Sequence, residues 1–162
     1  MQLFLQKPDK HTYLRQKAHT EGMKATLKLL PASQALTVIG IFAIVYVFDR
    51  RNTIDIADIF LFTAVTITAV IWSLFSHIDI KKELIATTTV IKHMVLAGFS
   101  SGFYTLLGLR LFPQATDMEA VFLAALTTSM IASGAFVLAT TPKVAMVWIS
   151  VLGLGTAYAL LL

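Results

Sequence analysis

The chain contains no cysteine, which excludes disulfide bonds and thiolate metal sites. Charged residues are also scarce, because Asp, Glu, Lys and Arg together make up only 14% of the 162 residues. Soluble domains usually have about 25%. The first five residues lack the positive charge that precedes the apolar part of a signal peptide, so we expect no cleavable one. These absences disfavour a secreted domain and an ordinary soluble one.

Apolar residues dominate what remains: they make up 57% of the chain, and the mean hydropathy is +0.77. They gather in five stretches of about the 20 residues that cross a bilayer, at 29–48, 57–76, 92–112, 119–141 and 144–162. A soluble helix keeps one polar face, which these stretches lack. We therefore predict an all-α integral membrane protein, a bundle of about five transmembrane helices over 29–162, with the lipid bilayer as its main partner.

The 13 Lys and Arg residues divide unevenly between the two sides of such a bundle. Ten lie in the first 28 residues, near the joint between the second and third stretches, or in the fourth joint. Only Arg50, Arg51 and Arg110 lie on the other side. The positive-inside rule then places the amino end in the cytoplasm. We attribute the net charge of +4 to these segments and expect no nucleic-acid partner.

Residues 1–28 form a basic cytoplasmic arm in this interpretation. Its apolar stripe is weak, so three alternatives stay open: the arm lies along the membrane surface, it continues into the first span, or it is solvated without lipid specificity. Pro31 lies where that span begins. Asp55, Asp58 and Asp117 precede predicted helices, and we expect them to cap helix ends rather than to bind a ligand.

Small residues concentrate in the third and fourth stretches. Gly98 and Gly102 form a G-x-x-x-G pair, and Ser133 and Gly134 lie in a similar run. Such residues allow helix backbones to approach closely. We favour packing within one bundle over a dimer interface, although the pattern alone does not separate the two.

The ionisable residues give little sign of chemistry. His77 and His93 lie at the cytoplasmic ends of the second and third stretches, where they are weak candidates to bind haem or a metal; charged interfacial residues are the preferred interpretation. No charge lies at the centre of a stretch, which disfavours a transporter. Trp72 and Trp148 lie near stretch ends, as in an aromatic belt. We expect no catalytic residue, no metal and no cofactor in this chain.

One segment carries a family resemblance. Residues 134–145, GAFVLATTPKVA, lead into an apolar helix that ends with ALLL at 159–162. This run resembles the later part of the multi-span membrane module that precedes GGDEF and EAL domains in bacterial cyclic di-GMP proteins. Residues 102–104 and 111–113 are similar to the third span of such modules. Related modules also precede histidine kinases.

The resemblance implies a sensory input module in the bacterial inner membrane, working as a homodimer or in a larger complex. Family members typically have six spans and then a cytoplasmic output domain. This chain has five stretches and no GGDEF, EAL or kinase motif, so we expect it to be a truncated six-helix module whose catalytic domain lies outside it. The alternative is a small accessory subunit of a larger membrane protein complex.

Overall fold

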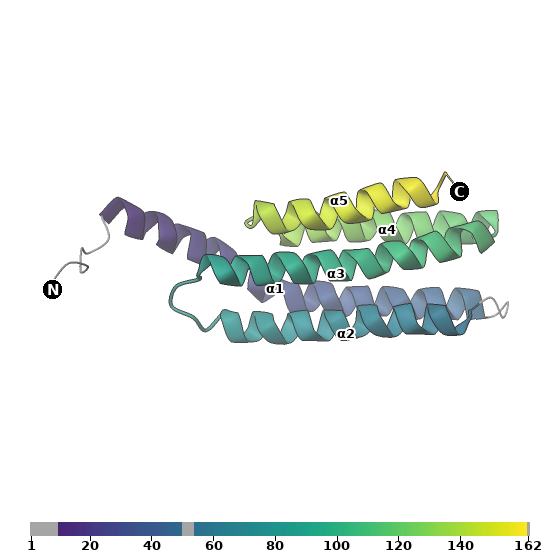
Figure 1. Cartoon of the computed structure of the whole chain (residues 1–162), viewed down its shortest axis with the longest axis horizontal. Helices are drawn as coiled ribbons and strands as arrows, with labels where there is room; N and C mark the ends of the chain where they lie inside the picture. Colours follow the sequence, from purple (N-terminus) through teal and green to yellow (C-terminus); the bar gives the residue numbers. More distant parts are fainter. Residues whose placement is uncertain (1–9, 50–53, 162) are drawn as a thin grey trace.

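Five long helices make up the part of the chain that the computed structural model describes, residues 10–49 and 54–161 (Figure 1). They are α1 (Lys10–Asp49), α2 (Ile56–Asp79), α3 (Thr87–Leu111), α4 (Asp117–Val137) and α5 (Pro142–Ala159), with a short 3₁₀ helix, η1 (Phe112–Gln114), after α3. The described residues contain no β-strand. All five helices are long and apolar enough to cross a membrane, which confirms the predicted fold class.

The helices pack side by side as a closed ring in the order α1, α2, α3, α5, α4. Helices that follow one another in the chain run in opposite directions, so α3 and α5 are parallel, and they share the most extensive interface. One end of the bundle holds the first half of α1, the loop 80–86 and the joint 138–141 between α4 and α5 (Figure 1). We call this the basic end, because it carries most of the Lys residues, and the other the opposite end.

Apolar side chains cover the outside of the bundle as well as its core. Val65, Leu107 and Leu152 have at most 1% of their surface exposed. Yet Phe42 and Leu154 on the outer faces are 69% and 74% exposed. In water such an apolar surface would favour aggregation, whereas lipid chains solvate it. The surface therefore fits a multi-pass membrane protein.

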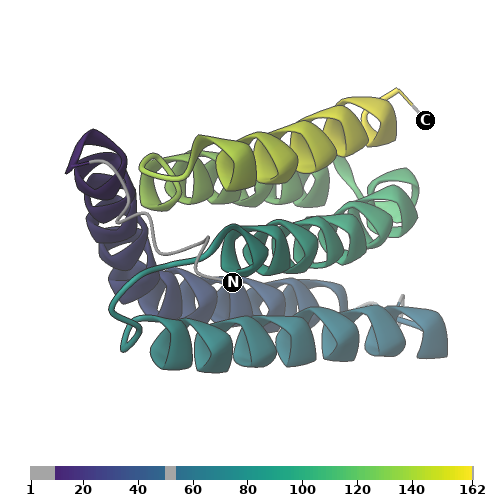
Figure 2. The same ribbon diagram turned by 60° about the vertical axis from the view of Figure 1, so that its left-hand side comes forward.

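Helix α1 joins the predicted arm and the first span in one continuous element. Its 40 residues would extend about 60 Å at 1.5 Å per residue, twice a hydrocarbon core of about 30 Å. Figures 1 and 2 show that its purple first part leaves the bundle at an angle. We attribute this bend to Pro31, which removes a helical hydrogen bond and clashes with the preceding turn.

The segment before the bend packs against the basic end. The Thr20 hydroxyl accepts a hydrogen bond from the backbone N–H of Ile85, at 3.2 Å. The Thr140 hydroxyl donates to the carbonyl oxygen of Gly22, at 2.7 Å, and also contacts the Thr26 hydroxyl. Residues 20–30 thus hold the loop 80–86 and the joint 138–141 together.

Local capping explains where two of the helices begin. The Asp55 carboxylate accepts a hydrogen bond from the backbone N–H of Asp58, and the Asp58 carboxylate accepts one from the backbone N–H of Asp55. This reciprocal pair, a capping box, satisfies two backbone N–H groups at the start of α2. This confirms the expected cap at Asp55. At α4 the cap is Thr116, paired in the same way with Glu119, while Asp117 lies in the first turn.

Gly134 allows a close approach between α4 and α5. A methyl group at this position would lie 2.2 Å from Nε1 of Trp148, closer than any real contact. The indole therefore packs directly on the α4 backbone, and its N–H donates to the carbonyl oxygen of Met130, at 3.3 Å. Gly153 in α5 differs, because nothing lies within 4 Å of the corresponding position.

Gly134→Ala is expected to destabilise the bundle, whereas Gly153→Ala is its matched control. Overpacking costs about 1–3 kcal/mol, which exceeds the gain of about 0.5–1 kcal/mol from replacing Gly in a helix. Gly153→Ala keeps that gain without the clash. Thermal unfolding in detergent, followed by circular dichroism, should show a lower Tm for Gly134→Ala only. Equal Tm values for the two variants would contradict this packing.

Candidate functional site

The buried face of α2 ends in a carboxylate. Val65, Ala69, Trp72, Ser76 and Asp79 follow helical spacing, and all five are buried. Asp79 has 0% of its surface exposed. A carboxylate taken out of water needs charged or hydrogen-bonding partners around it. The end of this stripe is therefore an electrostatically demanding position, as is the start of α2, where Asp58 is also 0% exposed.

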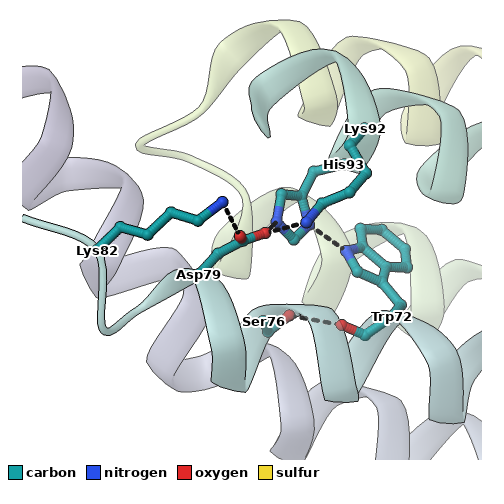
Figure 3. A network of polar contacts seen from close by, with 6 residues as sticks. All are labelled: Trp72, Ser76, Asp79, Lys82, Lys92 and His93. Carbon is teal, nitrogen blue, oxygen red and sulfur yellow. Dashed lines mark hydrogen bonds and ion pairs between the residues drawn. The ribbon is translucent and has the colours of Figure 1, made fainter. Parts of the chain in front are cut away.

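Three side chains surround the Asp79 carboxylate (Figure 3). Lys82 from the loop lies with Nζ 2.6 Å from Oδ1. The other oxygen, Oδ2, pairs with Lys92 Nζ and lies 3.0 Å from Nε2 of His93. Lys92 also lies over the Phe75 ring, 4.4 Å from its centroid. The charge is thus compensated by residues of α3 and of the preceding loop, which ties α2 to α3.

His93 is held as a neutral imidazole by its two partners. The Trp72 indole N–H can only donate, and it lies 2.9 Å from Nδ1 of His93. Nδ1 must therefore accept, which places the ring proton on Nε2, facing Asp79. Neither nitrogen retains a free lone pair for a metal or for a substrate proton. In this arrangement the ring bridges Trp72 and Asp79.

Trp72 extends this network into the middle of the bundle. Its ring packs on Trp148 of α5, with centroids 6.0 Å apart. The two indoles are only 1% and 4% exposed, so the predicted place in an aromatic belt is wrong. The reason is the face on which each lies: both point at the interior, where Gly134 leaves room for Trp148. Trp72, His93 and Asp79, with Lys82 and Lys92, form what we call the Asp79 network.

The two histidines of the sequence prediction do not share a surface. His93 is 1% exposed, whereas His77 lies on the exposed side of α2. No group of three His, Cys, Asp or Glu side chains with metal-binding geometry occurs among the described residues. Sequence reasoning missed Trp72 and Asp79 as site residues. Their common spacing with Val65 and Ala69 was the available signal.

The four small-residue positions have different surroundings. Gly134 lies against Trp148, whereas Gly102 has nothing within 4 Å of its missing side chain, and Gly98 only Val147, at 3.6 Å. Both α3 glycines line an open apolar groove of about 580 Å³ on the outer face of α3. Ser133 lines a second groove of about 330 Å³ between α1 and α4. The internal packing of α3 therefore does not require either glycine.

A second polar cluster lies at the opposite end. Arg110 donates from Nε to Oδ1 of Asp58, at 2.7 Å, and from Nη2 to Oδ2 of Asp55. The backbone N–H of Asp58 holds the pKa of the Asp55 carboxyl below its ordinary value, and the Arg110 guanidinium acts in the same direction. Arg110 thus bridges α3 to the start of α2.

Comparison with known proteins gives no match to any protein-family model, curated protein or solved structure.

His93→Leu is expected to lower the stability of the bundle, because it removes the partner of a buried indole N–H and one partner of Asp79. Each loss costs about 1–3 kcal/mol. His93→Gln offers an amide that can accept from Trp72 and donate to Asp79, so it should retain a large part of the stability. Thermal unfolding in detergent measures both.

The control is His77→Leu on the exposed side of the same bundle, which should leave the Tm near the wild-type value. The assignment of the Asp79 network fails if His93→Leu and His77→Leu unfold at the same temperature.

Proposed function

We propose that the chain is the membrane-embedded sensory module of a bacterial signalling protein. It lies in the inner membrane with its amino end in the cytoplasm, works as a homodimer, and regulates a cyclic di-GMP output domain outside these 162 residues. A signal acts by favouring one of two helix packings over the other, which requires a different affinity for each.

The observation that carries the proposal is the place of the Asp79 network at the basic end. The positive-inside rule turns this end toward the cytoplasm, where an output domain would lie. The network ties α2 to α3 and, through Trp72, reaches α5. A change in packing inside the bundle is therefore coupled to the end from which a cytoplasmic domain would be controlled.

A second support comes from the segment that resembles the sensory modules. Residues 134–145 span the last turn of α4, the joint 138–141 and the start of α5. Gly134 in this run lies against Trp148, and Thr140 bonds to Gly22 of α1. The resembling residues thus hold the contacts between the last two helices and the bent first helix.

Reporter fusions test the orientation. Green fluorescent protein fused after Leu84, in the loop 80–86, should fluoresce, and alkaline phosphatase fused there should be inactive. The same reporters after Ala115, between η1 and α4, should give the opposite result. The reversed pattern at both sites would place the basic end outside the cytoplasm and remove the basis of the proposal.

Cellular cyclic di-GMP tests the function. His93→Leu and Asp79→Asn are introduced into the complete reading frame in its own host, with His77→Leu as the matched control. Coupling between sites typically amounts to factors of about 5–150, so we expect the nucleotide level to change by about fivefold or more in the first two strains only.

Unchanged nucleotide levels at normal protein abundance would contradict the sensory role. Purification in mild detergent then tests the accessory-subunit alternative. Stoichiometric co-purification with a defined enzyme complex would support that alternative against the sensory module.

A further inference from the structure

A small cavity lies inside the bundle, where α1, α2, α4 and α5 meet. Ser33 and Gln34 of α1, Trp72 of α2, Gly134 of α4 and Trp148 of α5 contribute to its lining. It has about 10 Å³ of space for the centre of a water-sized molecule. This is roughly the space that one water needs, and too little for a larger ligand.

One residue in the wall of this cavity has a polar atom without a partner. The Gln34 side chain is 4% exposed, and its Oε1 has no hydrogen-bond partner among the described residues. An unpaired amide oxygen inside a bundle is costly, and more so where lipid surrounds the helices and bulk water cannot reach it. The size of the cavity and the unpaired Oε1 of Gln34 are independent observations, and both indicate a water molecule.

We propose that Gln34 binds a single buried water molecule in this cavity. One O–H of the water donates to Gln34 Oε1. Ser33 and Trp148 line the same cavity, and in this proposal the Ser33 hydroxyl and the Trp148 indole N–H are the further partners of the water. The Trp148 N–H lies 3.3 Å from the Met130 oxygen, longer than the usual distance of about 2.9 Å, so it can share its hydrogen with the water.

This water connects the bent helix to the rest of the interior. Gln34 lies three residues after Pro31 in α1, and Trp148 belongs to α5. Trp72, whose N–H is bonded to His93, forms another part of the wall. The bound water therefore brings α1 into polar contact beside the Asp79 network. This inference does not depend on the proposed signalling role.

Water–protein NMR tests the site on the intact chain in detergent. The chain has two tryptophans, so selective ¹⁵N labelling gives two indole signals, which Trp72→Phe and Trp148→Phe assign. We expect a cross-peak between water and the Trp148 indole proton in the wild type. Gln34→Met, which keeps the length of the side chain without its polar end, should abolish that cross-peak.

Gln114→Met is the matched control, because Gln114 is exposed at the opposite end and donates to the carbonyl oxygen of Arg110. It should leave the cross-peak unchanged. Absence of the cross-peak in the wild type overturns the proposal, and this outcome needs no variant to fold. Persistence in Gln34→Met overturns it as well. The cyclic di-GMP measurement is separate, so failure of either proposal can be recognised on its own.

Discussion

The carboxylate of Asp79 has no exposed surface in a bundle whose outer faces are apolar, so its charge has to be compensated by neighbouring side chains. Lys82, Lys92 and His93 meet this need, and they do so only in one register of α3 against α2. Trp72 then orients His93 and carries the same constraint to Trp148. One buried charge and its partners thus constrain contacts among three helices.

Polar contacts join α2 to α3 at both ends, and each contact includes a carboxylate without exposed surface. At the opposite end, Asp58 is 0% exposed and pairs with Arg110, whose side chain is 36% exposed. The neighbouring pair of Arg110 and Asp55 is more open to water and salt, which screen it. At the basic end, Asp79 is also 0% exposed, and Lys82 and Lys92 are 46% and 31% exposed. The register of the two helices is therefore constrained at both ends, and the basic end adds the buried bond between His93 and Trp72.

The helices were predictable because a span requires a minimum length of apolar sequence, and the cap at Asp55 because capping is local. The Asp79 network was not, since Asp79 finds Lys92 and His93 only through the register between two helices. Proximity to a span end placed Trp72 in an aromatic belt, although its spacing with Val65 and Ala69 assigns it to the buried face. Gly102 and Gly134 look alike in sequence, yet one faces open space and the other an indole.

The contact between α1 and α4, which we call the seam, differs from that between α2 and α3, where side chains of the two helices form ion pairs. The hydroxyls of Thr37, Ser129 and Ser133 line its groove, and each donates to a carbonyl of its own helix. Because these bonds lie within one helix each, a shift of α1 against α4 would not break them. Because α1 contacts the loop 80–86 and the joint 138–141, displacement there would reach the basic end directly. Helix α1 is thus the element through which a shift at this seam would reach both loops beside the Asp79 network.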